Sequence, residues 1–280
     1  MKEFIGKVNG KHGIFHFCHY DQYIGLAIRE YGEFSEIELS IMQKFIENGD
    51  VIFDIGANVG AFTMPFAKKV GEKGEVYCFE PQDFIYDLLC KSIEENNLKN
   101  VRTFHNGLGE NRQKIEIDRI DYSSLGNFGG VGLKDDYDNA ATARILKGEK
   151  KQMVEIIRLD DFLNIKKCNF IKMDVEMMEI DVLKGGKKFI EKYRPIMWLE
   201  NHIKYPNQIN DYLSQLNYNV FWAMTQLFNP ENYFLNDKNY FDDTCTINSL
   251  AVPKEKASSH DTKWLENSNY SPKILHTRTL

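Results

Sequence analysis

Short apolar runs alternate with stretches of helical periodicity along most of this chain. Runs of strand length, rich in branched and aromatic residues, cover 51–55, 75–79, 100–105, 153–159, 170–173, 196–199, 218–223 and 246–252. Apolar residues recur at helical spacing over 35–47, 61–70, 83–96, 178–192 and 206–216. Strands and helices that alternate through short joints predict parallel βαβ units and therefore an α/β fold. The run 246–252 follows a strand rather than a helix, which allows it to pair antiparallel.

Three segments depart from this alternation. Residues 1–34 are rich in aromatic side chains and predict short strands and turns that pack on the core. Residues 110–150 contain a glycine- and serine-rich stretch and predict an insertion, which we interpret as a mobile lid over substrate, with a long surface loop as the alternative. Residues 254–280 are polar and predict a surface tail. The main domain is expected over 35–253, and a capping box at Ser35 and Glu38 opens its first helix.

Charge and cysteine content argue against several classes of protein. The 280 residues carry a net charge of −6, which disfavours a nucleic-acid duplex as the main partner because such proteins present a basic face. The five cysteines are scattered and never stand in C-x-x-C spacing, so neither a disulfide framework nor a zinc site is indicated. We find no signal peptide and no apolar run of membrane length, and we expect a cytoplasmic protein without a membrane partner.

The apolar run 51–55 leads into a glycine-rich turn, Asp54-x-Gly56-x-Asn58-x-Gly60. Glycines allow the backbone to turn sharply and to come close to a ligand. The helix that follows offers unpaired N–H groups and the positive end of its dipole. Glu80 ends the next strand, and a carboxylate about 20 residues past such a turn commonly accepts hydrogen bonds from ribose hydroxyls. This arrangement indicates a nucleotide cofactor.

The details of the turn favour S-adenosylmethionine as that cofactor. A dinucleotide turn has the pattern G-x-G-x-x-G, which brings a helix N-terminus to a pyrophosphate. Here an acid stands at the strand tip and Asn58 stands inside the turn. These side chains suit a ligand with an ammonium and a carboxylate, and they suit a pyrophosphate poorly. A dinucleotide and a purely structural turn remain the alternatives.

Several stretches carry a family resemblance when they are taken together and in order. They are Phe53-Asp-Ile-Gly-Ala-Asn-Val-Gly60, Val76-Tyr-Cys-Phe-Glu-Pro81, Asn97-Leu-Lys-Asn-Val101, Ile171-Lys-Met-Asp-Val-Glu176, Glu179-x-x-Val-Leu-Lys-Gly185 and Arg194-Pro195 through Glu200. They resemble the FkbM family of S-adenosylmethionine-dependent methyltransferases over about residues 30–252. One departure is Met177, which stands where the family usually has glycine after D-V-E.

The resemblance implies a Rossmann-like class I methyltransferase fold, with a seven-stranded, mostly parallel sheet and helices on both faces. It also implies O-methylation of a hydroxyl on a sugar, a polysaccharide or a small metabolite. The acceptor is then a hydroxylated small molecule or a glycan. Two alternatives stay open: N-methylation of an amine or a protein, and a donor-binding domain without catalysis. The oligomeric state is not indicated.

The expected cofactor site follows the strand ends. The turn should hold the amino-acid end of the donor, Glu80 should bind the ribose diol, and the segment after 100–105 should lie beside the adenine. The full expected set is Asp54, Gly56, Ala57, Asn58, Gly60, Glu80, Pro81, Asn106, Gly107 and Asp174. For Asp54 a capping role is the alternative reading, and for Asn106 a turn-forming role is nearly as well supported.

The expected catalytic residues are Asp174, Glu176, Glu200 and His202. The first two follow the run 170–173 and the last two end the run 196–199, so all should lie at the carboxyl rim of a parallel sheet, where ligands bind. The carboxylates Asp174 and Glu176 suit three roles: holding a divalent cation, orienting the acceptor or taking its proton. His202 is the candidate general base because imidazole titrates near neutral pH. A helix-capping role for the acids and a surface position for His202 are the alternatives.

Overall fold

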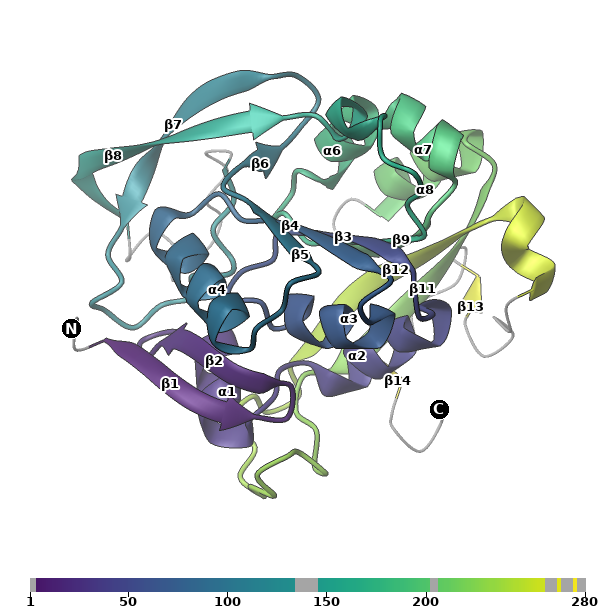
Figure 1. Ribbon diagram of the computed structural model, residues 1–280. Coiled ribbons are helices and arrows are strands. Elements are labelled where there is room, and N and C mark those ends of the chain that lie inside the picture. The colour runs from purple at the N-terminus through teal and green to yellow at the C-terminus, as the bar shows by residue number, and fades with distance from the viewer. Residues whose placement is uncertain (1–3, 134–145, 202–205, 260–265, 268–273, 276–280) are drawn as a thin grey trace.

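The central sheet has the predicted α/β architecture in this computed structural model, which describes residues 4–133, 146–201, 206–259, 266–267 and 274–275 (Figure 1). Its main strands are β3 (Val51–Ile55), β4 (Glu75–Phe79), β5 (Val101–Phe104), β9 (Phe170–Met173), β10 (Ile196–Glu200), β11 (Tyr218–Gln226) and β12 (Cys245–Pro253). They lie in the order β5-β4-β3-β9-β10-β12-β11. The strands from β5 to β10 pair parallel, and β12 pairs antiparallel with β10 and with β11. The predicted fold class and the antiparallel last strand are confirmed.

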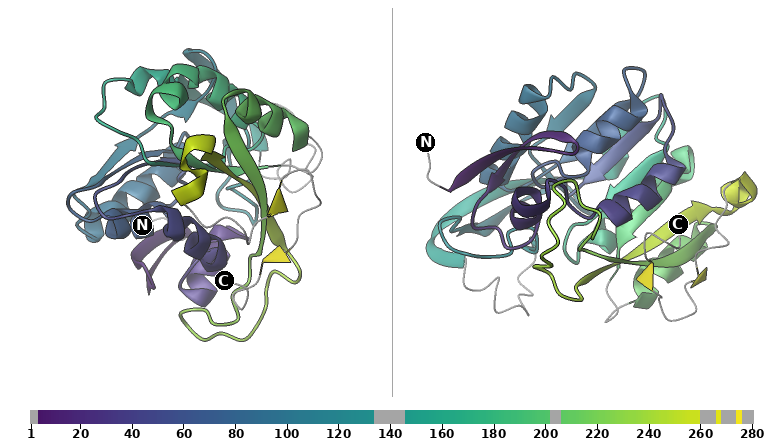
Figure 2. Two further views of the ribbon diagram at one scale, coloured as in Figure 1. Left: turned by 90° about the vertical axis from the view of Figure 1, so that its right-hand side faces the viewer. Right: turned by 90° about the horizontal axis from the view of Figure 1, so that it is seen from below.

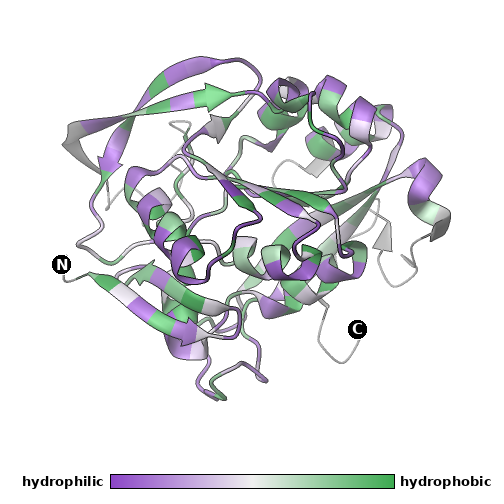
Figure 3. Ribbon diagram, in the orientation of Figure 1, coloured by the Kyte–Doolittle hydropathy of each residue, from purple (hydrophilic) through white to green (hydrophobic). Residues whose placement is uncertain are grey.

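Helices cover both faces of this sheet. On one face lie α2 (Glu36–Met42), α3 (Thr63–Val70) and α4 (Asp83–Glu95); on the other lie α6 (Glu179–Gly185), α7 (Lys187–Tyr193) and α8 (Pro206–Gln215) (Figures 1 and 2). The sheet strands are therefore apolar on both sides, as Figure 3 shows by hydropathy. No helix of the described residues is both long and apolar enough to cross a membrane.

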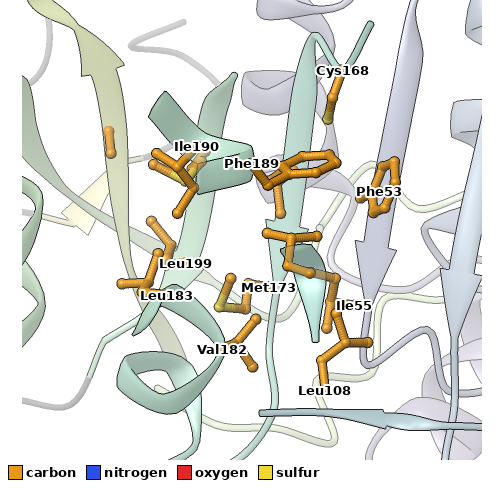
Figure 4. Packing of buried hydrophobic residues seen from close by; sticks show 14 of the residues in the cluster. Phe53, Ile55, Leu108, Cys168, Met173, Val182, Leu183, Phe189, Ile190 and Leu199 are labelled. Atoms are coloured by element: carbon orange, nitrogen blue, oxygen red, sulfur yellow. The ribbon is translucent and has the colours of Figure 1, made fainter. Parts of the chain in front are cut away.

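Alternate residues of β3 serve the two faces. Phe53 and Ile55 point to the side of α6 and α7, where the Phe53 ring lies 4.8 Å from that of Tyr77 and 5.1 Å from that of Phe189 (Figure 4). Ile52 points to the opposite side, toward α2 and α3. The strand period of two puts Asp54 on that second face as well, so its carboxylate enters the core beneath α3.

The predicted helix over 178–192 is two helices. The chain breaks at Gly185-Gly186 between α6 and α7. A Cβ at Gly185 would lie 2.0 Å from the backbone oxygen of Gly109, so only glycine lets the two segments approach this closely. Helical periodicity alone does not reveal this contact because Gly109 is distant in sequence.

The predicted capping box at Ser35 and Glu38 is not formed. The Ser35 hydroxyl donates a hydrogen bond to Glu38 Oε2 over 2.7 Å and makes no bond to the helix backbone. The other carboxylate oxygen of Glu38 accepts a hydrogen bond of 2.8 Å from the indole of Trp198 on β10. A buried indole N–H requires a partner, and this tertiary contact holds Glu38 in the core. After α2 the chain forms a short 3-10 turn, η1 (Gln43–Phe45).

The N-terminal segment is a hairpin followed by a helix that the sequence analysis missed. Strands β1 (Ile5–Gly10) and β2 (Gly13–Cys18) pair antiparallel, and α1 (Ile24–Tyr31) follows. The hairpin binds α4: the amides of Ile14 and His16 donate to Asn96 Oδ1 and to Ser92 Oγ over 2.9 Å each. This anchors the hairpin on α4 (Figure 1).

The insertion contains more regular structure than expected. Strands β6 (Gly107–Leu108), β7 (Gln113–Ile120) and β8 (Leu146–Ile157) form a separate sheet, in which β7 and β8 pair antiparallel. The 3-10 turn η2 (Leu159–Phe162) then leads back to β9. Residues 134–145 of the predicted insertion lie outside the described residues. In the tail, η3 (Lys254–Ser259) is followed by two short strands, β13 (Glu266–Asn267) and β14 (Ile274–Leu275), which pair with β11.

A buried carboxylate between β2 and α1 makes stability depend on pH. Asp21 accepts a hydrogen bond of 2.9 Å from the Tyr23 amide, and its backbone bridges to Gly126. Burial raises the pKa of its carboxyl group from 3.8 to about 6, against the effect of backbone amides that lower it. The native state therefore binds this proton more tightly than the unfolded chain does. The free energy of unfolding should fall as pH rises through this window.

The free energy of unfolding of Asp21→Asn is compared with that of the wild type at two pH values. The difference, variant minus wild type, should be about 2 kcal/mol larger at about pH 7.5 than at about pH 4. Other titrating groups are common to both proteins, so the difference between the two proteins isolates Asp21. Urea unfolding at the two pH values measures it. A difference that does not change with pH would contradict the assigned protonation of Asp21.

Candidate active site

A cavity of about 460 Å³ opens at the carboxyl rim of the central sheet. Its floor comes from the ends of β3, β4, β9 and β10. Its walls come from α1, from the segment 127–133 and from the start of β12. Residues on the floor and around the turn are Gly56, Ala57, Asn58, Glu80, Pro81, Gln82, Asn106, Gly107, Lys172, Asp174, Glu176 and Glu200. Residues on the far side include Tyr23, Asn127, Asn201, Thr244, Thr246 and Asn248.

The glycine turn is held from both sides. The amides of Gly56 and Ala57 both donate to the backbone oxygen of Phe79, at the end of β4. Gly56 has a φ of 78°, and a Cβ there would lie 1.8 Å from the backbone oxygen of Asp174, at the end of β9. Asn58 also adopts a left-handed conformation, with a φ of 50°, which asparagine tolerates better than most residues. The turn is therefore wedged between the neighbouring strand ends.

Glu80 is a buried carboxylate that faces the cavity. One of its oxygens accepts a hydrogen bond from the Asn58 amide and the other from the Gln82 amide, both of 2.9 Å. Burial raises the pKa of Glu80 to about 7, although the two amide bonds lower it in part. Each carboxylate oxygen has a further lone pair, so Glu80 can accept additional hydrogen bonds from two vicinal hydroxyls. A ribose diol offers such a pair of hydroxyls.

Two of the expected cofactor residues lie beneath the turn rather than on the cavity wall. Asp54 is fully buried, and its Oδ2 accepts a hydrogen bond of 2.5 Å from the Thr63 hydroxyl on α3. Gly60 has a φ of 91° and joins the turn to α3. The remaining members of the expected set line the cavity: Gly56, Ala57, Asn58, Glu80, Pro81, Asn106, Gly107 and Asp174.

Three carboxylates of the expected catalytic set meet at one point of the rim. Oxygens of Asp174, Glu176 and Glu200 all lie within 4.8 Å of one another, which is close enough to hold one cation between them. Burial, and after it the charge of Asp174, raises the pKa of Glu176 to about 8 and that of Glu200 well above its usual range. His202, the expected general base, lies outside the described residues.

The departure from the family pattern at Met177 has a visible backbone consequence. Glu176 and Met177 have φ values of 50° and 74°, a left-handed pair that glycine adopts without strain. The Met177 side chain points outward and is 45% exposed, so it does not enter the cavity floor. Methionine at this position therefore carries backbone strain and adds no side chain to the cavity lining.

The sequence analysis missed Lys172. This lysine lies inside the apolar strand β9, its side chain is only 3% exposed, and it lines the cavity. Its ammonium lies 2.9 Å from the Gly56 carbonyl oxygen, 3.3 Å from Asp174 Oδ2 and 3.8 Å from Asp54 Oδ1. Burial alone would lower the pKa of Lys172, but the carboxylates of Asp174 and Asp54 raise it. A charged residue inside a buried parallel strand was the available signal.

The far wall was also not foreseen. Asn201 and Asn248 are buried polar residues on neighbouring strand ends, and the Asn201 amide nitrogen donates a hydrogen bond of 2.8 Å to Ser249 Oγ. Among the described residues, Asn201 Oδ1 has no hydrogen-bond partner. No motif marks Asn248, because the antiparallel β12 brings it to the rim from a distant part of the chain, whereas Asn201 directly follows Glu200 at the end of β10.

Comparisons with known proteins identify the family. The model of the methyltransferase FkbM domain matches residues 54–220. Methyltransferase 1 of Beauveria bassiana (strain ARSEF 2860) is 28% identical over 145 residues, which are 48% of this chain and 57% of that protein. Methyltransferase sdnD of Sordaria araneosa is 27% identical over 155 residues, 48% of this chain and 59% of that protein. The chain thus spans less than two thirds of either relative.

A solved structure with a similar course of the chain is that of the methyltransferase FkbM from Methylobacillus flagellatus KT. The two are 17% identical and superpose with a TM-score of 0.47. The matched region covers 73% of this chain and 44% of that one.

Proposed function

The chain belongs to the FkbM methyltransferase family, and we propose that it transfers a methyl group from S-adenosylmethionine to a hydroxyl of a sugar, a polysaccharide or a small metabolite. The observation that carries this proposal is a shared cavity: the glycine turn and Glu80 face the same space as the rim carboxylate Asp174. The wall that we assign to donor binding therefore meets the wall that we assign to proton removal. The matched family region, residues 54–220, contains all three features.

The donor wall fits S-adenosylmethionine in its chemistry. The backbone of Gly56, Ala57 and Asn58 suits the amino-acid end of the donor, and Glu80 suits the ribose. Asn106 and Gly107 line the cavity beyond Glu80, where the adenine would lie. Asp54 and Gly60 support the turn from below.

The acceptor wall supports a hydroxylated acceptor. Its side chains are amides, hydroxyls and carboxylates, which form hydrogen bonds with an uncharged polyol: Asn127, Asn201, Thr244, Thr246, Asn248 and Asp174. When bound, the donor supplies an activated methyl group, whose carbon–sulfur bonding pair stays on sulfur while the carbon bonds to the acceptor oxygen. The chain must hold that oxygen in line and remove its proton, and the carboxylate of Asp174 is the group we assign to the proton. Orientation can contribute roughly 7–11 kcal/mol and proton removal about 10²–10⁴-fold in rate.

N-methylation of an amine and donor binding without catalysis are the competing functions. Turnover separates them. The purified protein is incubated with S-adenosylmethionine and separate acceptors (neutral mono- and oligosaccharides, amino sugars, and simple amines), and S-adenosylhomocysteine is quantified. Sugar-dependent formation of S-adenosylhomocysteine is the expected result, and exclusive turnover of amines would overturn the O-methyltransferase assignment. Donor binding without turnover would favour the non-catalytic reading.

Calorimetric titration with S-adenosylmethionine and S-adenosylhomocysteine tests the donor site itself, and we expect micromolar affinity for both. The titrations are run with and without Mg²⁺ because three close carboxylates are a common cation-binding arrangement. An affinity that depends on Mg²⁺ would assign Asp174, Glu176 and Glu200 as metal ligands. An affinity that does not change would leave these acids to the acceptor. No binding of either nucleoside would overturn the proposed function.

A further inference from the structure

Lys172 carries the one side-chain cation that contacts both the donor turn and the acceptor rim among the described residues. Its ammonium donates to the Gly56 carbonyl oxygen at 2.9 Å, on the turn. It also lies 3.3 Å from Asp174 Oδ2, on the rim. The lysine side chain is 3% exposed, whereas that of Asp174 is 42% exposed. The buried ammonium of Lys172 therefore holds the partly exposed carboxylate of Asp174.

The surroundings of the ammonium restrict its position. Beneath it lies the fully buried carboxylate of Asp54, with Oδ1 at 3.8 Å, and to one side the ring of Phe62, with its centroid at 5.3 Å. The ammonium is thus surrounded by the Gly56 carbonyl oxygen, Asp174 and Asp54, and the aliphatic part of its side chain extends from β9. A lysine held in this way has little freedom to follow its partner, so Asp174 must adapt to Lys172 rather than the reverse.

Among the three rim acids, Asp174 is the one that we find paired with Lys172 in the described part of the chain. Oxygens of Glu176 and Glu200 lie within 4.8 Å of Asp174, and burial raises the pKa of both glutamates, so their protonated forms are favoured. Asp174 instead pairs with the Lys172 ammonium at 3.3 Å. Without it, the most exposed of the three carboxylates would be free to rotate into solvent, away from the cavity.

We propose that Lys172 is a positioning residue: it fixes the Asp174 carboxylate against the methyl group and the acceptor oxygen, in register with the donor turn. The inference rests on the proposed function, because it assumes that the donor occupies the turn. Lys172 acts through Asp174 and does not itself touch the reacting atoms. The donor turn and the acceptor-facing acid thereby become one rigid unit, tied through the Gly56 carbonyl.

The test compares binding of a charged and an uncharged nucleoside. S-adenosylmethionine carries a positive sulfonium, and S-adenosylhomocysteine has a neutral thioether at the same place. A carboxylate held at the transfer point favours the first over the second. Calorimetric titration of both nucleosides is performed on the wild type, Lys172→Met, Asp174→Asn and the double variant, so the readout needs no acceptor.

Either single substitution should weaken binding of S-adenosylmethionine about tenfold and leave S-adenosylhomocysteine within about threefold. The double variant should lose about tenfold as well, and not a hundredfold, because both substitutions remove the same contact. If Lys172 acted only as a nearby positive charge, its removal would strengthen binding of the sulfonium. That opposite sign would overturn the proposal, as would additive losses or equal losses for both nucleosides.

Lys172→Met also leaves Asp54 buried without its counter-charge, which endangers folding. The variant Lys172→Met/Asp54→Asn removes both charges and should recover thermal stability while keeping the reduced preference for S-adenosylmethionine. A recovered preference would contradict the proposal. Lys184→Met is the matched control, since Lys184 is exposed on α6 and its contact with Glu110 is 3.9 Å. If the wild type binds neither nucleoside, the proposed function fails together with this inference. Wild-type binding with equal losses in the variants refutes the inference alone.

Discussion

Glu80→Ala should weaken binding of S-adenosylmethionine by about 10²–10⁴-fold, since two charge-assisted hydrogen bonds at about 1.5–3 kcal/mol each would be lost with the ribose diol. The carboxylate is 3% exposed and faces the cavity, so no other described side chain can take over its place without moving the turn. The substitution also leaves the amides of Asn58 and Gln82 without their acceptor. Calorimetric titration of the variant measures the loss.

The control for Glu80→Ala lies at the other end of the same strand. Glu75→Ala removes a carboxylate that is 38% exposed and pairs with Arg102 on the surface. It should bind the donor as the wild type does. Thermal unfolding of both variants separates a lost ligand contact from a collapsed turn. Wild-type affinity in a folded Glu80→Ala protein would refute the assignment of Glu80 to the ribose.

Gly56→Ala should abolish donor binding and lower the free energy of unfolding by more than about 4 kcal/mol. Alanine at a φ of 78° costs about 1–2 kcal/mol in backbone strain. The larger part of the loss comes from the clash between the new Cβ and the Asp174 backbone oxygen, which would lie only 1.8 Å apart. The Cβ is fixed by the backbone of residue 56 and the oxygen belongs to the backbone, so the clash is relieved only by separating the ends of β3 and β9. Urea unfolding and calorimetric titration measure the two effects.

Gly49→Ala separates strain from overlap. Gly49 has a φ of 89°, close to that of Gly56, but its nearest atom would be Lys73 Cβ at 3.9 Å, an ordinary contact. This control should lose only about 1–2 kcal/mol of stability and keep its donor affinity. Equal losses in the free energy of unfolding of the two variants would mean that the close contact between residue 56 and the Asp174 backbone oxygen adds nothing to the effect of backbone strain.

The part of the cavity that we assign to the donor was predictable from the sequence, because the residues that form it lie close together in the chain. The turn Gly56–Gly60 and Glu80 belong to consecutive strands of one βαβ unit, so a strand-then-helix pattern fixes where they meet. The rim acids Asp174 and Glu200 were predictable for the same reason. They end parallel strands, and such ends share one edge of the sheet.

The acceptor half was decided by tertiary structure. Asn248 reaches the rim because β12 runs antiparallel between β10 and β11, and its register, with Glu200 opposite Asn248, is set by long-range pairing. The Glu38 carboxylate accepts a hydrogen bond from the buried indole of Trp198 and does not cap α2. In both pairs, Glu38 with Trp198 and Glu200 with Asn248, the two residues are distant in sequence.

Alternating apolar runs, glycines and strand-end acids determined by themselves the α/β class, the parallel βαβ units and the glycine turn of this protein. They report on contacts within one βαβ unit, where hydrogen bonding and side-chain period leave few choices. Tertiary structure decided which charge lies beside the buried carboxylate of Asp54. The neighbouring Asp174 lies only two residues along the chain from Lys172, but Asp54 meets Lys172 because β3 and β9 pair in the sheet. An unpaired buried ammonium is costly, so this pairing stabilises the lysine in the core.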